Sequence, residues 1–198
     1  IKQFKKKGEI WYEKHVNFEK NKKSFFFEKK INIKKIEKKI NFEISKNQNF
    51  IEYSELGLEY LREISKIIKK NTGGLLIIDY GYNNKKMKDT LKCVSNHKFA
   101  NIFDDIGNTD ITHNINFDLF RKFIKHIGNL ESNLTSQKKF LLKMGINNRA
   151  ELISKNLNFL EKANIFYRLR RLTDERYMGS LFKVMLIKNK KNKFNLGF

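Results

Sequence analysis

The chain has 198 residues, of which 40% are hydrophobic, so it can bury one core and form one domain or a domain with an insertion. It has no apolar run of 18 residues and no signal-peptide pattern, which argues against a membrane-spanning helix and against secretion. Cys93 is the single cysteine, so an intramolecular disulfide is excluded and a reducing compartment is favoured.

The formal net charge of +21 would ordinarily indicate nucleic acid or an anionic membrane surface as a partner. Lysine supplies most of this charge; asparagine, isoleucine and phenylalanine are also abundant, alanine is scarce and proline is absent. An AT-rich genome imposes such a composition through its codons. We therefore interpret the charge mainly as drift across a solvated surface, and a basic RNA-binding domain is the less favoured alternative.

The N-terminal part predicts a β-hairpin followed by a basic segment. Residues 9–16 alternate well enough for a strand, and residues 24–27 predict its returning partner after a polar turn. Ile33, Ile36 and Ile40 then recur three and four apart among lysines, which indicates a short amphipathic helix or a loop. That segment would either dock an acidic partner or remain a solvated face, and the second interpretation is favoured.

The most informative stretch is a helix followed by an apolar strand. Residues 50–53 predict a short strand, and Ser54 can cap a helix that ends near Gly73. Four consecutive aliphatic residues, 75–78, then predict a strand buried on both faces inside a parallel α/β sheet. Ligands of such sheets bind beyond the carboxyl ends of the strands, so the residues that follow this strand form the first candidate site.

The rest of the chain predicts one long loop and then alternating helices and strands. Residues 83–114 are rich in Asn, Asp, Gly and Thr and predict an irregular section of the kind that forms lids or binding loops. The later expected elements are a helix capped by Asn116 and ended by Gly128, a weak strand at 130–134, a helix from 135 ended by Gly145, a further helix beginning at Arg149, a helix from about 156, and a buried strand at 178–187.

Simple catalytic motifs do not occur. The four histidines lie far apart and none has a second ligand at zinc spacing, so no metal site is predicted. There is no nucleophile elbow, Walker loop or dinucleotide-binding fingerprint. The residue patterns alone predict an α/β domain with a polar site at the end of the strand at 75–78.

A series of short motifs in a fixed order carries more information. The motifs are Gln3-Phe4, Trp11-x-Glu13-x-x-Val16, Glu52-x-Ser54, Leu76-x-Ile78-Asp79-Tyr80-Gly81, Thr90-Leu91 with His97, Gly107-x-x-Asp110-Ile111-Thr112, Gln137-x-x-Phe140-Leu141, Gly145-Ile146-x-x-Arg149, Arg171-Leu172 and Met178-Gly179-x-x-Phe182-Lys183-Val184. This series covers nearly the whole chain. It closely resembles the MidA family of S-adenosylmethionine-dependent methyltransferases, whose mitochondrial members are protein arginine methyltransferases that assist the assembly of respiratory complex I.

The resemblance implies the C-terminal half of a class I, Rossmann-like α/β methyltransferase sheet. The strand at 75–78 would be the fifth, 130–134 the sixth and 181–187 the seventh, which inserts antiparallel. Residues 1–44 would form a substrate-side insertion with the hairpin, and residues 45–198 the C-terminal half of the methyltransferase domain.

The resemblance also implies where the cofactor binds. In this fold a glycine-rich turn after the first strand and an acidic residue after the second strand hold the cofactor. Both would precede Ile1, so S-adenosylmethionine would be bound mainly by residues upstream of this chain. No cofactor-binding residue is therefore assigned within the 198 residues, which would be inactive alone.

Carboxylates are the groups expected to act on an arginine substrate, because a guanidinium must be oriented and must lose a proton. By the resemblance, the candidate catalytic residues are Asp79 and Asp110, and the candidate substrate-binding residues are Tyr80, Gly81, Thr112 and His97. The structural alternatives are that Asp79 caps backbone N–H groups, that Asp110 fixes a turn and that His97 is a hydrogen-bonding loop residue.

One segment departs from the family pattern. After Thr112 the family has a small residue, then His or Asp, an apolar residue and Asp, whereas this chain has His113, Asn114, Ile115 and Asn116. Two ionisable positions have therefore become amides. A charge that the family supplies at the position of Asn114 would be lost, which puts the activity of the full-length protein in question.

The favoured function is methylation of a protein, at arginine, in connection with complex I assembly, with a complex I subunit as the candidate substrate. The alternative is a non-catalytic assembly protein that keeps the fold and docks onto an acidic protein. Neither nucleic acid binding nor membrane insertion is expected. The expected location is the cytoplasm of a bacterium or the mitochondrial matrix of a eukaryote.

Overall fold

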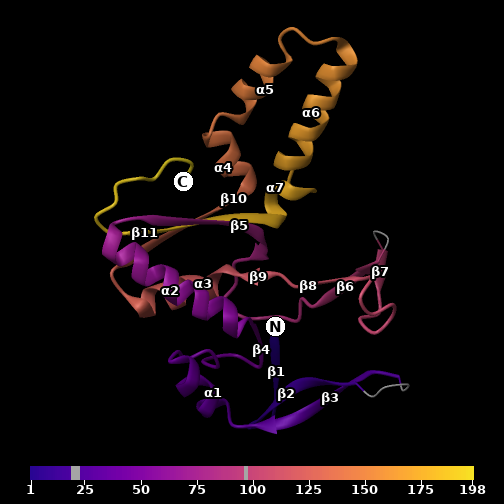
Figure 1. Cartoon of the computed structure of the whole chain (residues 1–198), viewed down its shortest axis with the longest axis vertical. Helices are drawn as coiled ribbons and strands as arrows, with labels where there is room; N and C mark the ends of the chain where they lie inside the picture. The colour runs from indigo at the N-terminus through magenta and orange to yellow at the C-terminus, as the bar shows by residue number, and fades with distance from the viewer. Residues whose placement is uncertain (19–22, 96–97) are drawn as a thin grey trace. The chain divides into compact units, whose positions relative to one another are not determined.

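The computed structural model of the chain describes residues 1–18, 23–95 and 98–198 (Figure 1). The chain forms two compact units. The first comprises Ile1–Leu61 and Asn83–Leu119, and the second comprises Arg62–Tyr82 and Phe120–Phe198. This division differs from the one predicted at residue 44, which stays a prediction.

The first unit contains an antiparallel sheet with the strand order β3-β2-β1-β4. Its strands are β1 (Lys2–Lys7), β2 (Ile10–Asn17), β3 (Phe25–Ile31) and β4 (Phe50–Tyr53). The predicted hairpin and the strand at 50–53 are confirmed. The lysine-rich sequence of β1 has no strand pattern, so this strand was not predicted. Pairing with β2 and β4 on its two sides and the fully buried ring of Phe4 hold it in place.

Helix α1 (Ile33–Ile40) confirms the helical interpretation of the basic segment. Ile33 and Ile40 are buried, while the four lysines between them are all exposed. Asn32 caps the helix by accepting a hydrogen bond from Lys34 N at 3.0 Å. The isoleucine spacing therefore places one apolar stripe against the unit and leaves the cations in water.

Glu37 is a buried carboxylate on the inner side of α1. Its Oε1 accepts hydrogen bonds from Ile44 N at 2.9 Å and from Ser45 N at 2.8 Å, and Lys34 Nζ lies 2.8 Å from Oε2. Burial by itself raises the pKa of this carboxyl, but the hydrogen bonds from Lys34, Ser45 and Ile44 together outweigh burial and hold the pKa below its ordinary value of 4.5. The carboxylate thus ties the segment after α1 to the helix.

Glu37→Gln should make the stability of the protein less dependent on pH in the acid range. A lowered folded-state pKa contributes stability that is present above pH 4.5 and is lost as the pH falls through the folded-state pKa. We expect the variant to be less stable by roughly 1 kcal/mol at neutral pH, and the difference to shrink as the solution becomes acid. Urea titrations of both proteins at several pH values measure it, with Glu63→Gln, an exposed partner of Lys66, as the control. A difference that does not change with pH would contradict this role.

Residues 83–114 do not form one irregular loop. It contains a small antiparallel sheet with the order β7-β6-β8, formed by β6 (Lys92–Ser95), β7 (Lys98–Ala100) and β8 (Asp110–Thr112). The predicted irregular section at 83–114 is therefore wrong in part. Strands of three or four residues are too short to show a periodic pattern, and only their pairing defines them.

The two helices that follow polar caps were predicted correctly. Gly57 N donates to Ser54 Oγ at 3.0 Å at the start of α2 (Glu55–Asn71). After the short strand β9 (Ile115–Asn116), Asn116 Oδ1 accepts from Asp118 N at 3.0 Å at the start of α3 (Phe117–Ile127). Each cap satisfies a backbone donor that has no partner within the helix.

The second unit contains three antiparallel strands, and β11 lies between the other two. They are β5 (Gly74–Tyr82), β10 (Leu130–Ser136) and β11 (Phe182–Asn189). The middle strand supplies the core: Val184, Met185 and Ile187 are fully buried. The pairing confirms the prediction that the last strand inserts antiparallel, and it shows that the neighbours of this strand are β5 and β10.

Two predictions about β5 are wrong. The strand was expected to be buried on both faces, but alternate side chains are open to solvent, and Leu76 and Ile78 are 45% and 49% exposed. The strand also continues through Tyr82, so the triplet that begins at Asp79 lies within it rather than beyond its end. A run of aliphatic residues looks the same whether one face or both are covered, because the neighbouring elements decide burial.

The helices of the second unit are α4 (Gln137–Lys143), α5 (Ile146–Ser154), α6 (Phe159–Thr173) and α7 (Met178–Leu181). Helices α5 and α6 lie side by side as a hairpin (Figure 1). Gly145, with a φ of 79°, makes the predicted left-handed turn between α4 and α5. Residues 178–187 were predicted as one strand, but their first four residues form α7 because the chain turns there before it enters β11.

Candidate functional site

Three of the predicted site residues lie together on β5 in the second unit. Tyr80 N donates to Asp79 Oδ1 at 2.7 Å, and the ring of Tyr80 packs edge-on against Phe182 with centroids 5.7 Å apart. Gly81 is buried. Lys183 stands opposite Asp79 in the strand register, and burial lowers the pKa of this lysine. Asp79 is half-buried, and the Lys183 amine donates a hydrogen bond to Ser180 O.

Two further predicted residues lie in the first unit. Asp110 and Thr112 occupy alternate positions of β8, so both side chains project from the same face of that strand. Asp110 is exposed. His97 lies outside the described residues. Because Asp79 and Asp110 belong to different units, their role as a catalytic pair stays a prediction.

Of the two asparagines that replace ionisable residues of the family, Asn114 is held through its backbone and Asn116 through its side chain. Asn114 N donates to Thr90 Oγ1 at 2.8 Å. Besides capping α3, Asn116 donates from Nδ2 to Asn84 O at 3.2 Å. The predicted capping role of Asn116 is thus confirmed, and the side chain also fastens the segment that leads into the small sheet.

The sequence reasoning missed a buried carboxylate in the first unit. Glu52 is 4% exposed and accepts hydrogen bonds from Gln3 Nε2 at 2.5 Å, from Thr90 N at 3.2 Å and from Thr90 Oγ1. Gln3 and Thr90 are themselves 4% and 5% exposed. All three residues occur in the motifs quoted above, but nothing in their spacing indicated that they meet.

Gln3 connects this buried carboxylate to a second one at the surface. Its Nε2 also donates to Asp89 Oδ1 at 2.7 Å, across 86 positions of sequence. Both neighbours of this nitrogen are carboxylates, which only accept hydrogen bonds, so the orientation of the amide is determined. Gln3 Oε1 consequently points away from them, and within residues 1–18, 23–95 and 98–198 it has no hydrogen-bond partner.

A pocket of about 290 Å³ lies beside Gln3 and Asp89. Its walls combine aromatic rings with charged groups of both signs, and the lining residues are Gln3, Phe4, Lys5, Tyr12, Lys14, Glu28, Phe50 and Asp89. All of them belong to the first unit. A flat cationic group could lie against the rings and donate hydrogen bonds to the carboxylates.

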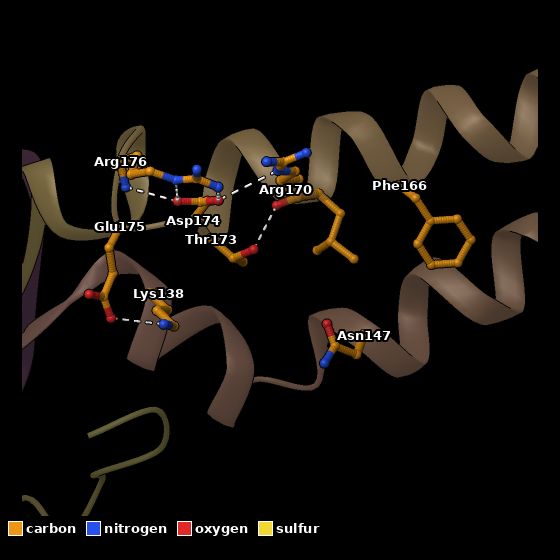
Figure 2. A pocket seen from close by; sticks show the side chains of 9 residues that line it. Lys138, Asn147, Phe166, Arg170, Thr173, Asp174, Glu175 and Arg176 are labelled. Carbon is orange, nitrogen blue, oxygen red and sulfur yellow. Dashed lines mark hydrogen bonds and ion pairs between the residues drawn. The ribbon is translucent and has the colours of Figure 1, made fainter.

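A larger open pocket of about 660 Å³ lies in the second unit, where α6 ends (Figure 2). Figure 2 shows Asp174 beside Arg176 and Arg170, whose nitrogens lie 2.8 Å and 3.5 Å from its Oδ2. These contacts, chiefly the hydrogen bond from Arg176, hold the pKa of Asp174 well below its usual range. Lys138 pairs with Glu175 at 2.8 Å. The charges here pair with one another, so the pocket is best explained as a junction that ends the helix.

Neither a metal-binding cluster nor a membrane-spanning helix occurs among the described residues. In this part of the chain, no group of three or more His, Cys, Asp or Glu side chains is arranged to hold a metal ion. No helix of that part is long and apolar enough to cross a membrane, since even α2 has only 17 residues.

Known proteins resemble this chain in sequence. Residues 1–135 match the model of the family described as "Putative S-adenosyl-L-methionine-dependent methyltransferase". The mitochondrial protein arginine methyltransferase NDUFAF7 of Danio rerio is 24% identical over 129 residues, which are 65% of this chain and 30% of that protein. The protein of the same name from Xenopus tropicalis is 25% identical over 124 residues, which are 62% of this chain and 28% of that protein.

Two crystal structures of COG1565 superfamily proteins from Burkholderia thailandensis share the fold. One, bound to S-adenosyl-homocysteine, has a TM-score of 0.77 and 21% identity and covers 100% of this chain and 52% of its own. The other has a TM-score of 0.76 and 22% identity, with 98% and 53% covered. The chain thus spans about half the length of these solved chains and less than a third of the curated relatives. Since the family match covers more than half of its residues, the chain belongs to this family of S-adenosyl-L-methionine-dependent methyltransferases.

Proposed function

We propose that the protein transfers a methyl group from S-adenosylmethionine to an arginine side chain of a protein substrate. The family match over residues 1–135 is the observation that carries this proposal. The names of the relatives support arginine as the acceptor. S-adenosyl-homocysteine, held by one of the B. thailandensis proteins, is what remains of the cofactor after it has given up its methyl group.

The cofactor itself does not find a complete cradle among the described residues. In this fold a glycine-rich turn leads from a strand into a helix and approaches the cofactor closely. The described strand-to-helix connections instead carry the caps Asn32, Ser54, Asn116 and Ser136. The roles proposed for this chain therefore lie on the substrate side.

On that side, a carboxylate has a defined task. Methyl transfer would form a bond between a guanidinium nitrogen and the methyl carbon while the sulfur–methyl bond of S-adenosylmethionine breaks and S-adenosylhomocysteine leaves. The nitrogen must lose one proton, so that the methylated guanidinium keeps a single positive charge. A carboxylate in hydrogen-bond reach can orient the guanidinium and take that proton. Asp79 and Asp110 are proposed for this task, with Tyr80, Gly81, Thr112 and His97 as substrate contacts.

The place of action is a further part of the proposal. The curated relatives are mitochondrial by name. Together with the MidA resemblance, this supports a role in the assembly of respiratory complex I, with one of its subunits as the substrate, in the mitochondrial matrix of a eukaryote or in a bacterial cytoplasm. A non-catalytic protein that docks onto such a subunit is the second candidate, favoured by the loss of ionisable residues at Asn114 and Asn116.

Methyl transfer by the protein with its full natural sequence tests the proposal. We expect labelled methyl groups from S-adenosylmethionine to appear on arginine, as identified by mass spectrometry of the acceptor protein. Asp79→Asn should lower kcat by about 10²-fold, the usual contribution of a general base, whereas Asp104→Asn, on the exposed section before β8, should leave it unchanged. Cofactor binding without any transfer would favour the docking protein.

A further inference from the structure

Asp89 is an anchored carboxylate at the wall of the small pocket in the first unit. Its Oδ1 accepts hydrogen bonds from Gln3 Nε2 at 2.7 Å and from Leu91 N at 3.2 Å. Its Oδ2 lies 3.7 Å from Lys14 Nζ, which is longer than a hydrogen bond, and the side chain is 52% exposed. One oxygen is therefore held by the protein, while the other can accept a hydrogen bond from a ligand.

The support behind Asp89 is buried. Gln3 is held in turn by Glu52, and Glu52 is held by Thr90 through its N–H and its hydroxyl. A connected chain of hydrogen bonds among buried groups restricts the carboxylate at its end to one orientation. The protein thus prepares Asp89 before any ligand arrives, which lowers the entropic cost of binding.

Gln3 has an unpaired buried acceptor, which is a second feature of this pocket that favours a ligand. The side chain is 96% buried, lines the pocket and has an acceptor, Oε1, without a partner among the described residues. An unpaired buried acceptor is costly, so such groups are rare in folded proteins unless something else satisfies them. This oxygen is shielded from solvent, so a planar N–H donor could satisfy it together with Asp89 only after the pocket widens toward it.

The other walls suit the faces of a guanidinium. Tyr12 and Phe50 contribute aromatic surface, and Glu28 contributes a second carboxylate. Guanidinium groups stack on aromatic rings and bind carboxylates with two parallel hydrogen bonds, whereas a lysine ammonium offers no flat face. A volume of about 290 Å³ is at the lower end of ligand pockets, which fits one side chain rather than a larger molecule.

The structure also shows which group would compete with a ligand. Lys14 Nζ lies 3.7 Å from Asp89 Oδ2 and 4.2 Å from the centroid of the Phe26 ring. This lysine is the cation that faces Asp89 in the absence of substrate. Its long flexible side chain is 31% exposed and can turn away, so it competes with an incoming cation without closing the pocket.

We infer that this pocket binds the arginine side chain of the protein substrate, with Asp89 as the principal acceptor, Gln3 and Glu52 as positioning residues and Lys14 as an internal competitor. The identity of the ligand as arginine rests on the proposed function. Asp89 would then orient the guanidinium for binding, and the removal of its proton would remain the task of Asp79 and Asp110.

Peptide binding in the absence of S-adenosylmethionine tests the inference. The probe is a fluorescent Gly- and Ser-rich peptide with one arginine, compared with peptides that have lysine or neutral citrulline at that position, and fluorescence anisotropy measures Kd. We expect the arginine peptide to bind most tightly. Asp89→Asn should weaken its binding by roughly tenfold or more, because a hydrogen bond to a charged group is worth about 1.5–3 kcal/mol. Lys14→Met should strengthen it several-fold.

Matched controls separate recognition from general effects of charge and stability. Glu43 has the same 52% side-chain exposure as Asp89 and lies 3.5 Å from a lysine, so Glu43→Gln loses one comparable charge far from the pocket lining. Lys66→Met is the control for Lys14→Met, because it also removes one lysine that pairs with a carboxylate but lies outside the pocket lining. Equal weakening by Asp89→Asn and Glu43→Gln would overturn the inference, as would weaker binding by Lys14→Met or equal binding of the lysine peptide.

The outcome can be separated from that of the proposed function. Binding that depends on Asp89, in a protein that transfers no methyl group, would support the pocket assignment and contradict the proposed methyltransferase. Methyl transfer to arginine by a protein whose peptide binding is unchanged by Asp89→Asn and Lys14→Met would support the proposed methyltransferase and contradict the pocket assignment.

Discussion

Replacement of Glu52 by alanine is expected to lower the free energy of unfolding by about 3–5 kcal/mol. The substitution removes the acceptor of three hydrogen bonds, one from Gln3 Nε2 and two from Thr90, whose side chains are 4% and 5% exposed. Each donor left unsatisfied in such surroundings costs about 1–3 kcal/mol, since water cannot replace the lost partner. Denaturant titration followed by circular dichroism measures the loss.

Glu43→Ala is the matched control for this prediction. Glu43 is half-exposed and lies 3.5 Å from Lys34, so water can take the place of its partner. Exposed ion pairs of this kind contribute about 1 kcal/mol or less. If Glu52→Ala destabilised the protein no more than Glu43→Ala, the buried network would have to be loosely packed or hydrated.

Gly179→Ala is expected to cost at least about 3 kcal/mol, because the new methyl group has no space. A Cβ at this position would lie 2.3 Å from Thr173 O and 2.8 Å from Asp174 O. These are backbone atoms, which cannot turn aside as the end of a side chain can. The backbone of Gly179 also donates to Asp174 O at 3.0 Å, so a shift that relieved the clash would lengthen this hydrogen bond.

Gly73→Ala is the control for Gly179→Ala. A Cβ at Gly73 would meet nothing within 4 Å, and this glycine does not have a left-handed backbone. Its replacement should be close to neutral or slightly stabilising, because alanine reduces the conformational freedom of the unfolded chain. Thermal unfolding of both variants separates the effects, and similar melting temperatures for the two would contradict the steric argument.

The stability predictions and the proposed binding site share the same residues in the first unit. Glu52 holds Gln3, and Gln3 holds Asp89, so the group proposed to receive a substrate arginine depends on a buried network for its orientation. The carboxylates of the larger pocket in the second unit differ in this respect. Asp174 is already neutralised by Arg176 and Arg170, which leaves little reason for a cation to bind there.

The amino-acid sequence by itself determined the features that depend on neighbours within a few residues. Ser54 and Asn116 each satisfy a backbone N–H two or three positions ahead, so both helix starts could be predicted. The left-handed turn at Gly145 and the alternation of residues 9–16 are likewise local. The ordered series of motifs identified the methyltransferase family without any knowledge of the contacts between them.

Only the tertiary structure decided which faces are covered and which polar groups meet. Leu76 and Ile78 are exposed although their sequence resembles that of a buried strand, because burial depends on elements elsewhere in the chain. β1 is a strand because it has a partner on each side. Gln3 and Asp89 are 86 positions apart, and no periodic pattern or capping rule reaches that far. Secondary structure is largely set by local interactions, whereas a binding site is assembled from distant residues by packing.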